Sequence, residues 1–120
     1  MMTKPIPYGR QSITQEDIDA VIETLTSDFL TQGPKVSEFE NQFAKYVDAK
    51  YAVAVSNGTA ALHLCALALN VSENVNVITT PITFAASANC VRYCGGNVHF
   101  VDINPDTFLI DEVKLKALID

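Results

Sequence analysis

The sequence lacks any run of lysine or arginine, and its 8 basic residues are outnumbered by 14 acidic ones, giving a formal net charge of −6. Proteins that bind nucleic acids or anionic membranes do so through clustered cations. The composition therefore argues against both kinds of surface. A single small phosphate held by backbone N–H groups is still compatible with it.

Long hydrophobic runs are also missing. No stretch approaches the ~20 consecutive apolar residues that a membrane-spanning helix needs. The first residues, Met-Met-Thr-Lys-Pro, contain no apolar segment of a signal peptide. We therefore expect a cytoplasmic protein. Its 120 residues fit one domain, and a hydrophobic content of 48% is enough for a globular core.

Cysteine is scarce and odd in number, with Cys65, Cys90 and Cys94 in apolar helical contexts. Cys90 and Cys94 are four residues apart and could supply half of a metal site on one helix face. A zinc site normally takes four ligands, and His63 and His99 each stand alone. The sequence therefore favours reduced cysteines buried in a core over a metal site.

Several common motifs are absent. There is no Gly-x-x-x-x-Gly-Lys phosphate loop and no Gly-x-Gly-x-x-Gly dinucleotide fingerprint, since Gly58 is the only glycine of its segment. Ser56 lacks the Gly-x-Ser-x-Gly context of a hydrolase nucleophile. The sequence therefore gives no support for a nucleotide hydrolase with a phosphate loop, for a dinucleotide-binding protein with the glycine fingerprint, or for a serine hydrolase.

The first fifty residues predict two amphipathic helices. Thr14 and the acidic residues after it indicate a helix N-cap, followed by apolar positions at helical spacing from Ile18 to Leu25. Glycine and proline mark residues 28–34 as a loop. A second helix, with apolar residues three and four apart, is expected over residues 36–47.

From residue 51 onward, strands and helices alternate. We expect strands at 51–55, 75–79 and 98–101, and helices at 58–69, 85–93 and 111–119, with Gly95-Gly96 ending the second of these helices. This order predicts an α/β fold with a mostly parallel sheet and flanking helices. The last helix has neither a glycine C-cap nor a following strand. The chain is therefore expected to hold an incomplete part of a larger α/β domain.

In such sheets, ligands bind beyond the carboxyl ends of the strands. Ser56-Asn57-Gly58-Thr59 follows the first expected strand. Gly58 would let a ligand approach the backbone, and the N–H groups of Gly58, Thr59 and Ala60 are expected to be unpaired. A helix N-terminus of this kind suits a phosphate or carboxylate. Taken alone, a helix capped by Ser56 or Asn57 without any ligand is the favoured interpretation.

The other two strand ends are less specific. Phe84 follows the second strand, and it could stack on a flat aromatic ring or pack beneath the next helix. Its position leaves both alternatives open. Asp102 ends the third strand and could orient a ligand. The neighbouring Asn104-Pro105-Asp106 favours a turn instead.

Five further segments occur in a characteristic order: Pro7-Tyr8-Gly9-Arg10-Gln11, Leu30-Thr31-Gln32-Gly33-Pro34, Ser56 to Leu62, Thr79-Thr80-Pro81-Ile82-Thr83-Phe84 and Phe100 to Thr107. Together they resemble the start of the DegT/DnrJ/EryC1/StrS family of pyridoxal-phosphate-dependent sugar aminotransferases. That family has the aspartate-aminotransferase fold of type I, and the resemblance covers essentially all 120 residues. It is greatest to members that act on UDP-4-keto-6-deoxy-hexoses in pseudaminic acid synthesis, a route to cell-surface polysaccharide.

The resemblance implies a role for each matching residue. Gly58 and Thr59 would hold the phosphate of pyridoxal phosphate, and Phe84 would stack on its pyridine ring. Glutamate would donate the amino group, and the active sites would draw on both chains of a homodimer. The residues implied to bind the nucleotide-sugar are Tyr8, Asp28, Phe29, Leu30, Thr31 and Gly58.

The same resemblance implies that the reactive centre is not among these residues. Family members carry the aspartate that pairs with the pyridine nitrogen and the Schiff-base lysine further along, beyond Asp120. No lysine of this sequence lies in a matching motif, so we expect no catalytic residue and no transaminase activity from the 120 residues alone. Residues 1–50 would be an N-terminal helical segment with a substrate and interface loop, and residues 51–120 the truncated start of the cofactor-binding large domain.

Two other functions fit the same residues. The chain could be a non-catalytic phosphate-binding or dimerising module. It could also belong to the family's sugar dehydratases, in which a histidine replaces the lysine. In each case, open strand edges and bare apolar faces favour self-association.

Overall fold

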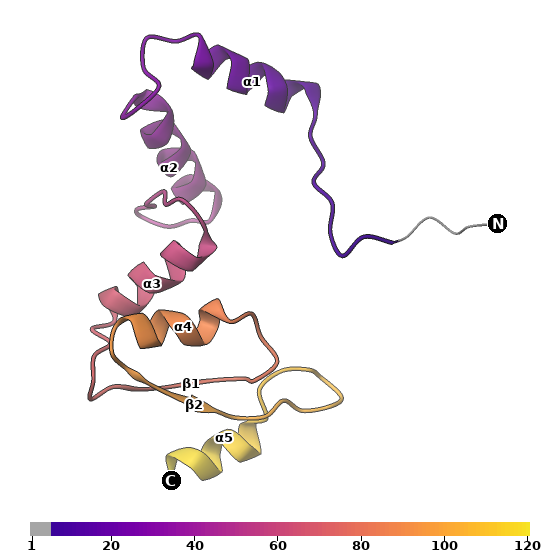
Figure 1. Cartoon of the computed structure of the whole chain (residues 1–120), viewed down its shortest axis with the longest axis vertical. Coiled ribbons are helices and arrows are strands. Elements are labelled where there is room, and N and C mark those ends of the chain that lie inside the picture. The colour runs from indigo at the N-terminus through magenta and orange to yellow at the C-terminus, as the bar shows by residue number, and fades with distance from the viewer. Residues whose placement is uncertain (1–5) are drawn as a thin grey trace, which may run out of the picture. The chain divides into compact units, whose positions relative to one another are not determined.

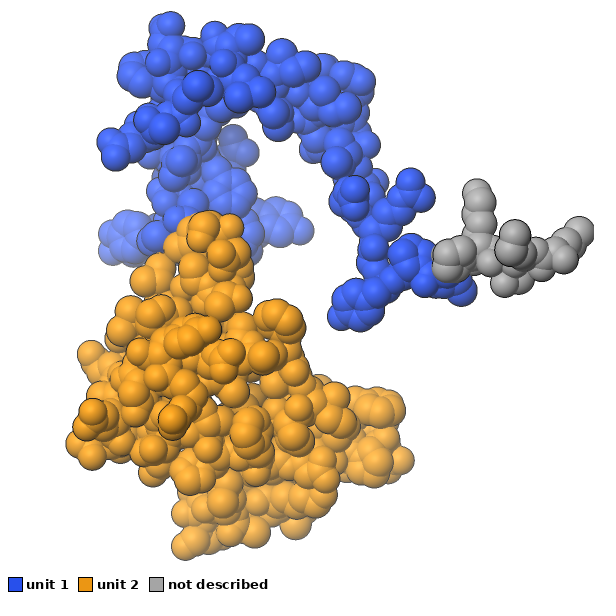
Figure 2. Space-filling view, in the orientation of Figure 1, with its two compact units in different colours: residues 1–54 blue, residues 55–120 orange. Residues whose placement is uncertain are grey.

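The computed structural model describes residues 6–120, and the chain forms two compact units, Met1–Ala54 and Val55–Asp120 (Figure 2). The first unit contains helices α1 and α2. The second contains α3, β1, α4, β2 and α5 in chain order (Figure 1). Within residues 6–120, no helix combines the length and the apolar character needed to cross a membrane.

The first unit begins its helical part with α1 (Gln15–Leu25). The predicted N-cap is confirmed, because Asp17 N donates to Thr14 Oγ1 at 3.4 Å and Thr14 N donates to Asp17 Oδ2 at 2.8 Å. This reciprocal capping box satisfies donors that a helix start otherwise leaves free. It explains why the helix starts directly after Thr14.

The second predicted helix is also confirmed, as α2 (Pro34–Tyr46). Proline suits the first helical position because it has no N–H to satisfy there. The preceding Gly33 leaves no room for a side chain, since a Cβ at this position would lie 2.7 Å from the Cβ of Phe29. The helix ends where Asp48 takes a left-handed conformation (φ 53°) and Ala49 N donates to Ala44 O at 2.8 Å.

The predicted strand at residues 51–55 is wrong. In the part of the chain that the structure describes, these residues pair with no other strand. Ala54 N instead donates to a side chain of α2, Glu40 Oε1, at 2.9 Å. A continuous apolar run with valines and a tyrosine gives the segment strand propensity, but a strand also needs a partner, which propensity does not provide.

The second unit carries a two-stranded parallel sheet between its helices. α3 (Gly58–Ala68) precedes β1 (Asn76–Thr79), and α4 (Ala86–Tyr93) connects β1 to β2 (Asn97–Phe100). The register runs from Asn76 opposite Asn97 to Thr79 opposite Phe100. The parallel arrangement and both later strands are confirmed. The sheet is narrower than expected because residues 51–55 do not join it.

The core of the second unit is small and lies where α4 packs on the sheet and on α3. Its buried residues are Ala66, Val71, Cys90 and Val91, with partly buried valines of both strands around them. Cys90 is thus a core residue, as predicted. The same expectation is wrong for Cys65, which is exposed on α3, and Cys94 is only partly buried.

Two glycines end α4. Gly95 has a left-handed backbone (φ +82°), and its N–H donates to Arg92 O at 3.0 Å, while Gly96 N donates to Val91 O at 3.0 Å. These two bonds form a Schellman motif. The predicted helix stop at Gly95-Gly96 is therefore confirmed. A Cβ on Gly96 would lie 2.6 Å from Val71 Cγ1 and 2.9 Å from Val91 Cγ1, so this position has no room for a side chain.

After β2 the chain makes a hydrogen-bonded loop and then α5 (Glu112–Ile119). Asp102 Oδ1 accepts from Ile103 N at 2.9 Å, and Asn104 Oδ1 accepts from Asp106 N at 2.8 Å. Both side chains therefore accept hydrogen bonds from neighbouring backbone N–H groups, and the turn predicted at Asp102 is confirmed. None of the residues of α5 is buried.

The ion pair that joins this loop to α5 gives a pH-dependent prediction. Lys114 Nζ lies 3.2 Å from Asp102 Oδ2, and the pKa of Asp102 is held below its ordinary value of 3.8 by the N–H of Ile103 first and by Lys114 second. Because the folded state favours the carboxylate, its small stabilisation is present above the unfolded pKa and is lost as the pH falls through the folded pKa. Lys114→Met should raise the pKa of Asp102 in an NMR titration, whereas Lys45→Met should leave it unchanged. An unchanged pKa in Lys114→Met would contradict the pairing.

Candidate functional site

The N-terminus of α3 is built by Asn57. Its backbone is extended (φ −169°, ψ 168°), and its side-chain Oδ1 accepts from Ala60 N at 2.9 Å. Of the two capping candidates, Asn57 is therefore the cap. Its Nδ2 also donates to Ser56 Oγ at 3.2 Å. The expectation that Ala60 N–H is unpaired is wrong, because the cap takes that donor.

Gly58 and Thr59 remain the donors of the site. As the first two residues of α3, they have no carbonyl one turn earlier in the helix to donate to. Gly58 is exposed, and a Cβ placed on it would have no atom within 4 Å. The helix start thus presents two N–H groups, the positive end of the helix dipole and free space in front of Gly58. This arrangement fits a phosphate group.

Phe84 lies in the connection between β1 and α4, two residues before α4 begins. It is 77% exposed, so the alternative that it packs beneath the next helix is wrong. Its carbonyl accepts from Ser87 N at 3.0 Å, and the neighbouring Thr83 Oγ1 lies 3.0 Å from Ser87 Oγ, which fixes the backbone of this turn. A phenyl ring held out from a fixed turn is available to stack on a flat ligand.

The two helix starts belong to the same unit. α3 and α4 pack against each other, and in Figure 1 they run in the same sense, with both N-termini on the same side. Gly58 and Thr59 begin α3, and Phe84 precedes α4 by two residues, so the predicted phosphate donors and the predicted ring platform belong to the starts of two packed helices. Ser87, four residues after Thr83, is the member of this turn that sequence reasoning missed. The spacing of two hydroxyl residues by one helical turn was the available signal.

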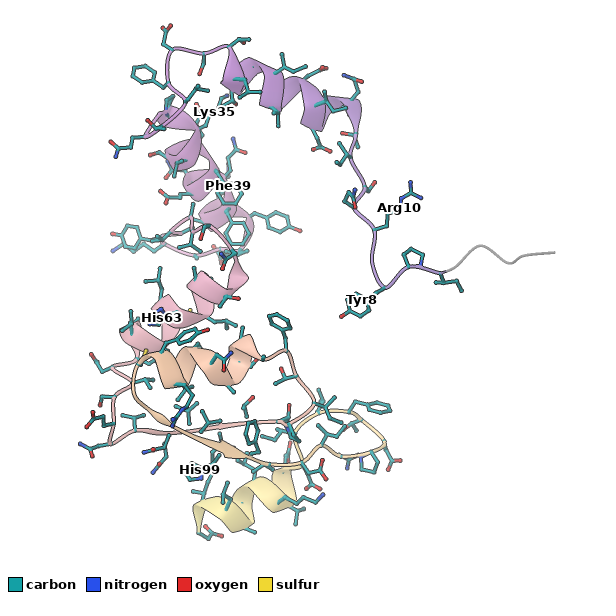
Figure 3. All side chains as sticks on the ribbon, viewed as in Figure 1. Tyr8, Arg10, Lys35, Phe39, His63 and His99 are labelled. Atoms are coloured by element: carbon teal, nitrogen blue, oxygen red, sulfur yellow. The ribbon has the colours of Figure 1, made fainter. Side chains whose placement is uncertain are left out.

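The predicted nucleotide-sugar residues, apart from Gly58, lie in the first unit. Tyr8 is fully exposed (Figure 3). Asp28, Phe29, Leu30 and Thr31 form the connection between α1 and α2, in which Phe29 and Leu30 are exposed and Ser27 Oγ donates to Phe29 O at 3.2 Å. The role of these residues toward a sugar stays a prediction.

All lysines that the structure describes are exposed, as predicted. Lys35 Nζ lies 3.3 Å from both Glu23 Oε1 and Glu38 Oε2 (Figure 3), and hydrogen bonds to Glu38 and then Glu23 raise its pKa. An amine that attacks a carbonyl needs the opposite shift. The remaining described lysines are Lys45, Lys50, Lys114 and Lys116, all exposed. Lys4 lies outside the described residues.

The two histidines are each engaged by a neighbouring element. The ring of His63 on α3 meets the ring of Tyr93 edge-on, with 5.4 Å between centroids. His99 Nε2 on β2 lies 3.1 Å from Asn76 Oδ1 on β1. Within residues 6–120, no three His, Cys, Asp or Glu side chains gather in a way that could hold a metal ion.

Known proteins match nearly the whole length of this chain. The model of the DegT/DnrJ/EryC1/StrS aminotransferase family matches residues 11–120. The spore coat polysaccharide biosynthesis protein SpsC of Bacillus subtilis is 45% identical over 95% of this chain. A UDP-4-amino-4,6-dideoxy-N-acetyl-beta-L-altrosamine transaminase of Campylobacter jejuni is 46% identical over 93%. The chain spans 29% of the length of each of these two relatives.

Solved structures agree with the sequence relatives. The Helicobacter pylori aminotransferase involved in the biosynthesis of pseudoaminic acid superposes with a TM-score of 0.83 at 36% identity, over 98% of this chain and 32% of its own. The NtdA protein of Bacillus subtilis, solved with bound cofactor PMP, superposes with a TM-score of 0.79 at 35% identity, over 90% of this chain and 26% of its own. The fold is thus a partial α/β piece of the kind found in aminotransferases that use pyridoxal phosphate. On the strength of the match over residues 11–120, the chain belongs to the DegT/DnrJ/EryC1/StrS aminotransferase family.

Proposed function

We propose that Gly58, Thr59 and Phe84 form the phosphate- and ring-binding part of a pyridoxal phosphate site in a nucleotide-sugar aminotransferase. The observation that carries this proposal is the open N-terminus of α3, with two N–H donors and unobstructed space at Gly58. It is supported by the family match and by the relative solved with bound PMP. The bound cofactor would supply an electron sink for amino-group transfer.

The residues of this chain would bind and orient rather than react. Asn57 keeps the first turn of α3 in place by accepting from Ala60 N, so the N–H groups of Gly58 and Thr59 are fixed before a phosphate arrives. Phe84 would set the plane of the pyridine ring. Such preorganisation lowers the cost of ordering a ligand on binding.

We propose a UDP-4-keto-6-deoxy-hexose as amino acceptor and glutamate as donor. The acceptor is supported by two Campylobacter jejuni relatives named as UDP-sugar transaminases, at 46% and 45% identity, and by the Helicobacter pylori structure. Tyr8 and residues 28–31 would contact the nucleotide-sugar. The active enzyme would be a cytoplasmic homodimer that contributes to cell-surface polysaccharide.

For the 120 residues alone, we propose a passive phosphate-binding module. The specific observation in its favour is the state of the lysines, since Lys35 and Lys114 are held in ion pairs and Lys50 lies over the ring of Tyr51 at 5.1 Å. None of the three is desolvated in the way that would activate an amine.

Titration of the purified chain with pyridoxal phosphate tests both proposals. We expect saturable binding that inorganic phosphate displaces, and no turnover of a UDP-keto-sugar with glutamate. After borohydride treatment, intact mass spectrometry should find no stoichiometric adduct on a single lysine. Turnover, or one saturating lysine adduct per chain, would contradict the passive module. Absence of phosphate-competitive binding would contradict the cofactor site itself.

A further inference from the structure

The turn between β1 and α4 contains a pair of hydroxyl groups. Thr83 Oγ1 lies 3.0 Å from Ser87 Oγ, and either oxygen can be the donor. The same turn is closed along its backbone, where Ser87 N donates to Phe84 O at 3.0 Å. Ser87 is therefore bonded to Thr83 through its side chain and to Phe84 through its backbone.

Ser87 is itself held by the core of the second unit. It is half-buried on α4, and the thiol of Cys90 donates to Ser87 O at 3.4 Å. Cys90 and the next residue, Val91, are buried members of the core. The hydroxyl pair thus connects an exposed turn to a helical residue that is anchored in the core.

The direction of the Phe84 ring depends on this turn. Its side chain is 77% exposed, so packing against the described chain does little to hold it. Hydrogen bonds at Thr83 and at the Phe84 carbonyl restrict the backbone angles from which the ring projects. A ring that samples fewer directions before binding loses less entropy when it stacks on a ligand.

We propose that Thr83 and Ser87 are positioning residues, which hold Phe84 in the orientation that stacks on the pyridine ring of pyridoxal phosphate. This role rests on the proposed function, because it requires Phe84 to be the ring platform. The two hydroxyl groups act through Phe84 and not on the phosphate. Their removal should therefore weaken the binding of a phosphate that carries an aromatic ring and spare the binding of phosphate itself.

Calorimetric titration of the full chain with pyridoxal phosphate and with inorganic phosphate tests this role. Thr83→Ala and Ser87→Ala should each raise the dissociation constant for pyridoxal phosphate about two- to tenfold, as for the loss of one hydrogen bond. The dissociation constant for inorganic phosphate should stay unchanged. Thr83→Ser keeps the hydroxyl and should restore the wild-type affinity. Ser37→Ala, at an exposed position of α2, is the matched control for the loss of a serine hydroxyl.

A double-mutant comparison separates positioning of the ring from a general effect on the unit. In a Phe84→Ala background, Ser87→Ala should cause no further loss of affinity for pyridoxal phosphate, because the residue through which it acts is gone. A further loss in that background, or an equal loss of affinity for inorganic phosphate, would overturn the proposal.

The wild-type titration distinguishes failure of this role from failure of the proposed function. If the wild-type chain binds pyridoxal phosphate and Thr83→Ala binds it equally well, the positioning role alone is overturned. If the wild-type chain does not bind pyridoxal phosphate, the cofactor site is contradicted and the positioning role is overturned with it.

Amide hydrogen exchange in the ligand-free chain examines the turn without any cofactor. Exchange of the Ser87 amide should become faster in Thr83→Ala and return to the wild-type rate in Thr83→Ser. The amide of Val71, which donates to Ala66 O at 3.0 Å in the core, reports a general loss of stability and should exchange at the same rate in all three chains. An unchanged rate at Ser87, or a parallel rise at Val71, would overturn the proposal.

Discussion

Gly96→Ala should lower the free energy of unfolding of the second unit by about 1–3 kcal/mol, the usual cost of forcing an extra group into a packed core. The added Cβ would lie 2.6 Å from Val71 Cγ1 and 2.9 Å from Val91 Cγ1. Both valines are buried, and a short branched side chain cannot swing away as a long one can. The turn that holds Gly96 is itself fixed by the bond from its N–H to Val91 O.

Gly58→Ala is the matched control for this prediction. It adds the same methyl group, but at a position with no atom within 4 Å and at the start of a helix, where alanine is favourable. Urea denaturation followed by circular dichroism should show a lower midpoint for Gly96→Ala and an unchanged or higher midpoint for Gly58→Ala. Equal midpoints would mean that the core around Val71 and Val91 is looser than the structure shows.

The second large effect concerns binding. Gly58→Val should weaken pyridoxal phosphate binding by more than about tenfold, because its side chain would occupy the space in front of the N–H donors and because charge-assisted bonds to a phosphate contribute about 1.5–3 kcal/mol each. Stability should hardly change, since the same space contains no atom of the chain. Isothermal titration calorimetry with pyridoxal phosphate measures the affinity.

Ala117→Val on α5 serves as the control for binding. It adds two of the three carbon atoms that Gly58→Val adds, at an exposed helical position in a different element. Its affinity for pyridoxal phosphate should equal that of the wild-type chain. If Gly58→Val bound as tightly as this control, the phosphate would have to lie elsewhere.

Local signals in the sequence predicted most of the elements because they depend on neighbours along the chain. Thr14 and Asp17 are three residues apart, and that spacing alone makes the capping box of α1 possible. Gly95-Gly96 likewise ends α4 through contacts within one turn. Left-handed Asp48 and Asn70 end α2 and α3 in the same way, but Asp and Asn take this conformation too rarely for the sequence to reveal it.

What the sequence could not predict depends on distant partners. Residues 51–55 have the composition of a buried strand, yet they pair with no strand in the described chain, and Glu40 takes the N–H of Ala54 instead. Cys65 lies on an apolar helix but is exposed and is not part of the small core. Burial is decided by which elements pack together, and periodicity along one helix does not contain that information.

For the site, the sequence predicted which residues belong together but not which of their N–H groups are free. The order of motifs along the chain links Gly58, Thr59 and Phe84, and the structure adds that Phe84 is exposed and that Asn57 is the cap. The sequence assigned three free N–H groups to the start of α3. The structure leaves Gly58 and Thr59 because Asn57 Oδ1 accepts from Ala60 N. A side chain that caps a helix removes a donor from the ligand, and which residue does so depends on backbone angles.

We propose that the start of α3 binds the phosphate of pyridoxal phosphate, and an NMR titration of the ¹⁵N-labelled chain tests this most directly. Adding pyridoxal phosphate should shift the amide resonances of Gly58 and Thr59 most strongly, with saturation, and inorganic phosphate should shift the same two. The amide of Ala60, already bonded to Asn57, should move less. Saturating shifts confined to other parts of the chain, or none at Gly58 and Thr59, would contradict the claim.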